Sequence, residues 1–198
     1  MKKTAITTLA ICCLTASVVY SQASNNTKTV MEQKNYPKAL VDYDDFKNLV
    51  RELEKKRADH LVSLDVFLKM SKENNVVILD TRSDYRFNRK HLKGAIHLDF
   101  TDFTQENLLK LIPDTNSKIL IYCNNNFNGD QIDFASKIAR PKNNMETQIL
   151  SNRKPIMLAL NIPTHINLYG YGYRNIYELD ELVNVSDPRI KFEGTEVK

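Results

Sequence analysis

Between residues 76 and 179 the chain alternates short apolar segments with polar, turn-forming stretches. The apolar segments are rich in β-branched residues and too short for helices. Near-continuous apolar character indicates strands that are covered on both faces, as in a parallel sheet flanked by helices. We expect strands at residues 76–80, 95–98, 118–122, 166–169 and 176–179.

Apolar residues at helical spacing predict helices before and between these strands. A first amphipathic helix spans about residues 42–57, with acids in its first turn and basic residues in its last, as the helix dipole favours. Ser63 is a candidate N-cap for a second, short helix. Further helices are expected at residues 104–111 and 129–140, and a helical segment is expected to end before Pro163. The sequence therefore predicts an α/β fold with one open, mainly parallel sheet.

The first 40 residues follow neither pattern. Lys2 and Lys3 precede an uncharged, mostly apolar stretch at residues 4–20. Small residues then bracket cleavage points after Ser21 or Ala23, which is typical of a secretory signal peptide. We expect a signal peptide at 1–23, a flexible leader at 24–40, an insertion loop at 141–155, and a single domain spanning 41–198.

Two other interpretations of the N-terminus fit its residues less well. A membrane anchor needs about 20 apolar residues, and this stretch is shorter and contains four threonines. A lipoprotein signal would use Cys12 or Cys13, but Ile11 stands before Cys12, where Gly, Ala or Ser is expected. The sequence thus favours a bacterial protein located in the periplasm or secreted, with no membrane contact after cleavage.

Composition narrows the choice of function. With 198 residues, 42% of them hydrophobic and 26% charged, the chain suits one globular domain. A net charge of only +4 gives no reason to expect nucleic-acid binding. No pair of cysteines has zinc-site spacing, and neither do the histidines, so we expect no metal and no cofactor; these histidines are His60, His91, His97 and His165.

Cys123 is the most informative single residue. It stands at the carboxyl end of an apolar strand and is followed by a polar loop at residues 124–129. Ligands of open α/β sheets bind beyond the carboxyl ends of the strands. A helix is expected after this loop, and its N-terminus lowers the thiol pKa, which predicts a nucleophilic sulfur. A buried structural thiol is the alternative.

Three motifs occur in order along residues 76–180. Asp80-Thr-Arg82 is followed by His91-Leu-Lys-Gly-Ala-Ile96, next comes Leu120-Ile-Tyr-Cys123, and the last is Gly172-Tyr-Arg-Asn-Ile176. In these motifs the chain resembles the rhodanese-like family, and more narrowly an exported bacterial single-domain branch of it. The resemblance implies a single rhodanese-like domain.

The resemblance also implies a sulfurtransferase. Cys123 would be its catalytic residue, accepting sulfane sulfur from a donor such as thiosulfate, becoming a persulfide and passing the sulfur to a thiol acceptor. The loop amides would bind the persulfide and the oxygens of a small sulfur-containing anion; the loop residues are Asn124, Asn125, Asn126, Phe127, Asn128 and Gly129.

The loop departs from the family pattern. Asn128 stands where sulfurtransferase loops usually carry arginine, and residues 124–129 contain no Lys or Arg. An anionic donor would then rely on amides alone, which predicts weak thiosulfate affinity. The related phosphatases need arginine where this chain has Gly129, so we do not expect phosphatase activity. The rival hypothesis is a non-catalytic binding module or a redox sensor. Outside the loop, Arg86 stands where Glu is common, and Asp80 with Arg82 predicts a structural ion pair.

Overall fold

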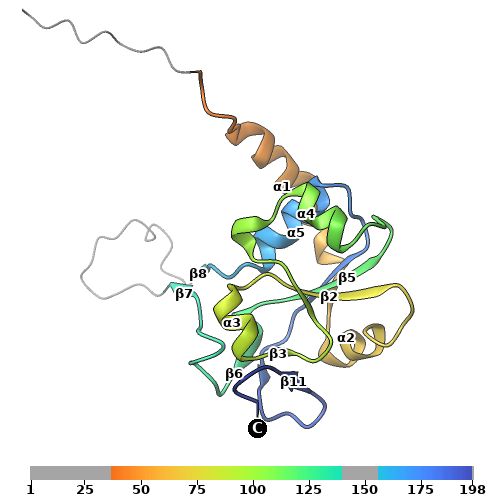
Figure 1. Ribbon diagram of the computed structural model, residues 1–198. Coiled ribbons are helices and arrows are strands. Elements are labelled where there is room, and N and C mark those ends of the chain that lie inside the picture. Colours follow the sequence, from red (N-terminus) through yellow and green to blue (C-terminus); the bar gives the residue numbers. More distant parts are fainter. Residues whose placement is uncertain (1–36, 140–155, 198) are drawn as a thin grey trace, which may run out of the picture. The chain divides into compact units, whose positions relative to one another are not determined.

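A computed structural model describes residues 37–139 and 156–197. The expected signal peptide and insertion loop, and most of the expected leader, lie outside these residues. Five strands form a sheet in which all neighbours are parallel (Figure 1). Their order across the sheet is β1 (Leu61–Val62), β9 (Ile176–Leu179), β5 (Lys118–Tyr122), β2 (Val76–Asp80) and β4 (Ile96–His97).

The central strand β5 shows why this sequence forms a sheet covered on both faces. Ile119 and Ile121 belong to one buried cluster, whereas Leu120 and Tyr122 belong to another. Successive side chains of a strand point to opposite faces, so one apolar run serves two cores. The predicted α/β fold with a parallel sheet is confirmed.

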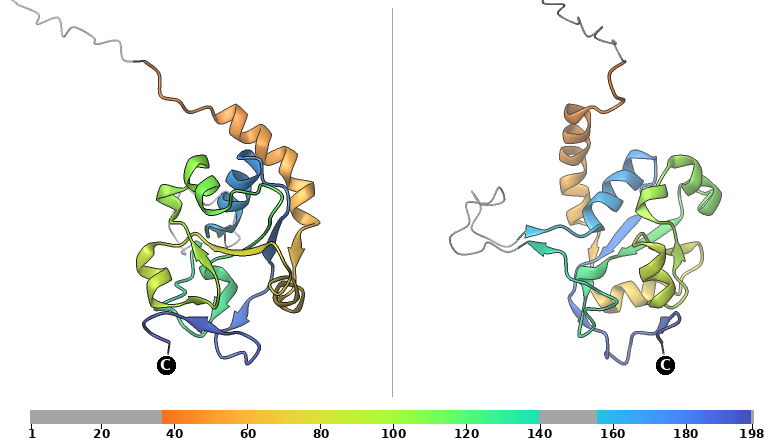
Figure 2. Two further views of the ribbon diagram at one scale, coloured as in Figure 1. Left: turned by 45° about the vertical axis from the view of Figure 1, so that its right-hand side comes forward. Right: turned by 60° about the vertical axis from the view of Figure 1, so that its left-hand side comes forward.

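Helices form the two outer layers. The helices α1 (Tyr43–Ala58), α4 (Gln105–Leu111) and α5 (Asn161–Gly170) lie on one side of the sheet, and α2 (Leu64–Met70) lies on the other (Figures 1 and 2). Side chains of the first three pack in the buried cluster of Ile121, and those of α2 pack in the cluster of Tyr122. Short helices α3 (Asp84–Arg89) and η1 (Phe100–Asp102) join the strands. Within the described residues, no helix is long and apolar enough to cross a membrane.

Polar side chains begin three of these helices. Asp42 accepts hydrogen bonds from two backbone N–H groups at the start of α1, at 2.9 and 3.0 Å. Ser63 caps α2, as predicted, and Thr104 caps α4. Each cap satisfies a donor that has no partner inside the helix.

Three two-stranded pairs surround the main sheet. β3 (His91–Leu92) pairs with β11 (Phe192–Glu193), and β7 (Ile138–Ala139) pairs with β8 (Ile156–Met157), both antiparallel. β6 (Phe127–Asn128) and β10 (Val183–Asn184) are parallel. The β6–β10 pair fixes the end of the loop at residues 124–129, which we call the Cys123 loop. The short helix η2 (Asn124–Asn126) fills the rest of that loop.

The expected strand at residues 166–169 is wrong, because these residues lie inside α5. Ile166 and Tyr169 are one helical turn apart and both are buried against the sheet, so the helical period explains their apolar character. The expectation that a helix ends before Pro163 is also wrong. Pro163 lies in the first turn of α5, where the missing N–H has no intrahelical partner to lose.

The expected helix at residues 129–140 does not form in its described part. A single turn is closed by the Phe134 N–H, which donates to the Asp130 carbonyl at 2.9 Å. Beyond that turn, the Lys137 N–H donates to the Asn125 side chain at 2.8 Å, and β7 pairs with β8. Tertiary partners outside the segment replace the bonds that a helix would have made.

A buried ion pair lies at the carboxyl end of β2. Asp80 is 0% exposed and Arg82 is 2% exposed, and the guanidinium donates to both carboxylate oxygens at 2.7–3.0 Å. Arg82 also donates to the carbonyls of Lys90 and Asp133. The Tyr122 hydroxyl donates to Asp80 as well. The pair thus ties β2 to β5 and to two loops, which confirms its predicted structural role.

Arg82→Ala should lower the free energy of unfolding by about 3–5 kcal/mol, because it leaves the Asp80 carboxylate buried without its cation. Arg51→Ala, on the exposed side of α1, is the control and should change it by less than about 0.5 kcal/mol. Urea unfolding of both variants measures the difference. Equal stability of the two variants would contradict the structural role of the pair.

Candidate active site

Cys123 lies at the carboxyl end of the central strand β5 and is 1% exposed. Its Sγ accepts a hydrogen bond from the Leu160 backbone N–H at 3.3 Å. Leu160 is the N-cap residue of α5, so the thiol lies at the amino end of a ten-residue helix. The expected helix terminus is therefore present, but it belongs to α5 and not to the segment after the loop.

Burial raises the pKa of the Cys123 thiol, and this effect outweighs the others. The N–H groups of Leu160 and Asn124 and the charge of Lys137 act in the opposite direction. The predicted lowering of the pKa is wrong for this structure. Burial removes water from the thiolate, and one backbone donor at the start of α5 with another in the loop does not compensate for that loss.

The carboxamide of Asn126 holds the Cys123 loop in place. Its Oδ1 accepts from the Cys123 N–H at 2.9 Å and from Asn161 at 2.9 Å. Its Nδ2 donates to the Leu179 carbonyl at 2.7 Å. Asn126 is 6% exposed, so these bonds are shielded from water. One side chain thereby joins the loop to β9 and α5.

Only part of the predicted binding loop lines a cavity. Asn124 is buried, lines a cavity and has an Oδ1 without a partner among the described residues. Phe127 packs in the core, and Asn128 pairs with β10. Gly129 has a φ of +86°, a conformation that favours glycine. The ligand-binding roles of Phe127, Asn128 and Gly129 stay predictions, because these residues have structural positions.

Two backbone N–H groups of the loop already donate hydrogen bonds to carbonyls nearby in the chain. The Asn126 N–H donates to the Cys123 carbonyl at 3.0 Å, and the Phe127 N–H donates to the Asn124 carbonyl. In this structure these two donors are directed at the loop itself. A bound anion therefore needs other partners.

A cavity of about 200 Å³ supplies such partners. Leu160, whose N–H donates to the sulfur, lines it together with Asn124. Arg82, Arg86 and Lys137 line it as well, and we call it the cationic cavity. Arg82 is neutralised by Asp80, whereas Arg86 and Lys137 form no ion pair with any residue in the described part of the chain. The expectation that an anion relies on amides alone is therefore wrong.

Sequence reasoning missed the contribution of these two cations. In the sequence, Arg86 is notable because it stands where the family that the chain resembles commonly has Glu. Nothing in the sequence points to Lys137, since it belongs to a segment that is expected to be helical. The chain after the loop turns back toward Cys123 only because of its pairing with Asn125 and β8.

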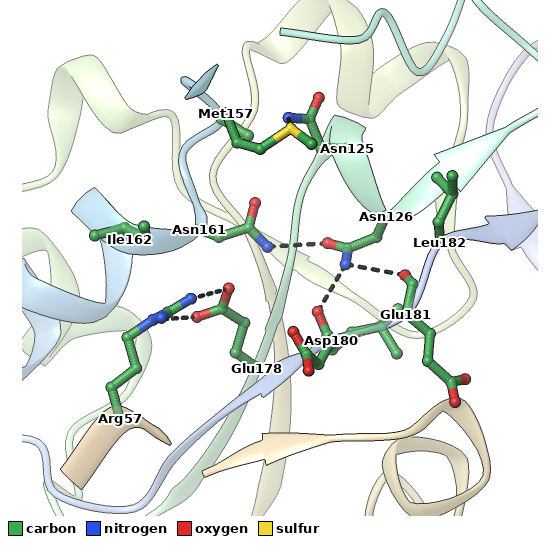
Figure 3. Close-up of a pocket in the computed structure, with 12 residues that line it drawn as sticks. Arg57, Asn125, Asn126, Met157, Asn161, Ile162, Glu178, Asp180, Glu181 and Leu182 are labelled. Carbon is green, nitrogen blue, oxygen red and sulfur yellow. Dashed lines mark hydrogen bonds and ion pairs between the residues drawn. The ribbon is translucent and has the colours of Figure 1, made fainter. Parts of the chain in front are cut away.

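A second cavity, of about 300 Å³, is lined by Asn125 and Asn126 of the loop together with residues of α1, α5 and β9 (Figure 3). Within residues 37–139 and 156–197, no group of three or more His, Cys, Asp or Glu side chains is arranged to hold a metal ion. His60, His91 and His97 instead bond backbone carbonyls through Nδ1.

The sequence model of the rhodanese-like domain matches residues 63–181. The chain belongs to the rhodanese-like domain family. The match begins at the cap of α2 and ends just after β9, so it contains the central strands and the Cys123 loop of this rhodanese-like domain. A comparison with curated protein sequences gives no match.

Several solved structures are similar to this rhodanese-like chain. A Bacillus halodurans protein has 12% identity over 67% of this chain and 74% of that one, with a TM-score of 0.39. The Rhodanese_3-like domain of an Anabaena protein has 15% identity over 60% and 92%, with a TM-score of 0.37. The polysulfide-sulfur transferase homodimer of Wolinella succinogenes has 14% identity over 75% and 97%, with a TM-score of 0.36.

The raised pKa of Cys123 predicts how alkylation depends on pH. The rate with iodoacetamide should rise with a midpoint above about 8.5, the value for a free thiol. Because the folded state holds the thiol proton more tightly, the free energy of unfolding should fall as pH rises above the unfolded pKa. The Cys123→Ala variant, which lacks the thiol, should lose less stability over that range. An alkylation midpoint below that of free cysteine would contradict the effect of burial.

Proposed function

We propose that this rhodanese-like protein carries sulfane sulfur as a persulfide on Cys123. One observation supports the proposal above the others: the Cys123 thiol, at the carboxyl edge of the sheet, adjoins a cavity lined by Arg82, Arg86 and Lys137. Small sulfur donors such as thiosulfate are anions. Arg86 and Lys137 form no ion pair within residues 37–139 and 156–197, and a cavity with two such cations suits an anionic donor.

The transfer consists of two substitutions at sulfur. Cys123 first loses its proton to solvent, and the thiolate attacks the outer sulfur of thiosulfate. A bond forms between Sγ and that sulfur, while the sulfur–sulfur bond of thiosulfate breaks and sulfite leaves with the electron pair. A thiolate acceptor, or cyanide in an assay, then attacks the outer sulfur of the persulfide and releases the Cys123 thiolate.

Arg86 and Lys137 would act on the donor. Their charges hold the sulfonate oxygens and stabilise the negative charge that develops on departing sulfite. Because Cys123 is 1% exposed, the donor reaches the sulfur only when Asn124 or Leu160 shifts. The energy for that shift comes from binding the anion to the two cations.

Incubation of the protein with thiosulfate should add one sulfur atom to Cys123, and cyanide should remove it as thiocyanate. Peptide mass spectrometry and thiocyanate release measure the two steps. Arg86→Ala and Lys137→Ala should each raise the KM for thiosulfate about fivefold to tenfold, since each removes one charge-assisted contact.

Arg51→Ala is the matched control, because it removes an equal charge away from the cavity. Its KM should equal that of the unaltered protein. No adduct on Cys123 with either thiosulfate or an organic persulfide would contradict the proposal. Equal KM values for Arg86→Ala and Arg51→Ala would contradict the role given to the cationic cavity.

The second candidate is a non-catalytic binding or redox-sensing module. The burial of Cys123 and its raised pKa favour this alternative. It predicts no sulfur adduct in the folded protein, although Cys123 reacts with iodoacetamide once the chain is unfolded. The persulfide experiment therefore decides between the two functions.

We also propose export from the cell's cytoplasm. The proposal rests on Lys2 and Lys3, the apolar stretch at residues 4–20 and the small residues around Ser21 and Ala23. N-terminal sequencing of protein recovered from the periplasm or medium of a bacterial host should begin at Gln22 or Ser24. Recovery of the uncleaved chain in the cytoplasm alone would contradict it.

A further inference from the structure

The larger cavity, of about 300 Å³, has a chemistry opposite to that of the cationic cavity. Five apolar side chains line it, and three of them are exposed: Met157 by 57%, Ile162 by 45% and Leu182 by 65%. Exposed apolar side chains gathered around a cavity mark an interaction site, because covering them removes apolar surface from water.

The charge of this cavity is negative. Arg57 donates to both carboxylate oxygens of Glu178, at 2.8 and 2.7 Å, so these two residues neutralise each other. Asp180 also lines the cavity and forms no ion pair with a described residue. Glu181 accepts from the Leu64 N–H at 2.8 Å, and its carboxylate points away toward α2 (Figure 3). Asp180 is thus the carboxylate available to a cation.

One side chain, that of Asn126, links this cavity to the backbone of Cys123. Asn126 lines it, and the same carboxamide accepts the Cys123 N–H at 2.9 Å and donates to the Leu179 carbonyl. An occupant that contacts Asn126 therefore contacts the group that positions the cysteine. The cationic cavity and this cavity both adjoin the Cys123 loop.

We propose that the larger cavity docks a segment of a partner protein that carries a Lys or Arg side chain between apolar residues. The cation lies at Asp180, and the apolar neighbours cover Met157, Ile162 and Leu182. A single small amine would leave these exposed side chains in water. That the partner is the sulfur acceptor rests on the proposed function, whereas the docking itself does not.

The test is an NMR titration of the full protein with three probes. The peptides are acetyl-Leu-Lys-Leu-amide and acetyl-Leu-Glu-Leu-amide, and the third probe is hexylammonium. The Lys peptide should shift the amide signals around Asp180 and Leu182 and bind at least tenfold more tightly than the Glu peptide.

Asp180→Asn and Leu182→Ser should each weaken binding of the Lys peptide about threefold to tenfold. Asp102→Asn and Leu109→Ser make the same changes at exposed positions away from the cavity and should leave binding unchanged. Equal binding of the two peptides, or no binding of either, would overturn the proposal. Hexylammonium binding as tightly as the Lys peptide would also overturn it, in favour of a small-amine pocket.

Cys123→Ser separates this inference from the proposed function. The variant should bind the Lys peptide as the unaltered protein does, because the cavity does not include the sulfur. Peptide binding without any persulfide on the unaltered protein would leave the docking site standing and remove the proposed function. Persulfide formation without peptide binding would support the proposed function and remove the docking site.

Discussion

The Asp80 carboxylate is fully buried at the carboxyl end of β2, where Arg82 and Tyr122 both donate hydrogen bonds to it. Arg82 then donates to the carbonyls of Lys90 and Asp133, which belong to segments on either side of the Cys123 loop. A buried charge without these bonds would be strongly destabilising, so the pair constrains every element that it joins. The position of β5, which leads directly into Cys123, and the wall of the cationic cavity therefore depend on the Asp80–Arg82 pair.

The Cys123 thiol is shielded from solvent. Cys123 has almost no contact with water, and its sulfur is bonded by the amino end of α5. Such protection would suit the exported sulfur carrier that we propose, because a buried thiol is less accessible to oxidants. In our proposals, an anionic donor binds at Arg86 and Lys137, and an acceptor segment with a cation between apolar residues binds at Asp180 and its neighbours. The opposite charges of the two cavities make the two ligands distinguishable.

The parallel sheet, the capped helices and the position of Cys123 could be predicted from the sequence, because apolar periodicity and end signals are local. The segment at 166–169 was assigned to a strand because a short apolar run does not reveal its period without its neighbours. The region after Asn128 was misassigned because its bonds go to Asn125 and β8, which are distant partners. The cationic cavity was missed for the same reason, since Lys137 reaches it through that pairing. The raised thiol pKa depends on burial, which the pattern around Cys123 does not measure.

The most direct test is a crystal structure of the protein after exposure to thiosulfate. Our account predicts a second sulfur atom bonded to Cys123 Sγ and directed into the cavity lined by Arg86 and Lys137, with the Leu160 N–H displaced from Sγ or bonded to the new sulfur. An unmodified Cys123 that keeps its bond to Leu160, in crystals where thiosulfate occupies the cationic cavity, would contradict the sulfur-carrier function.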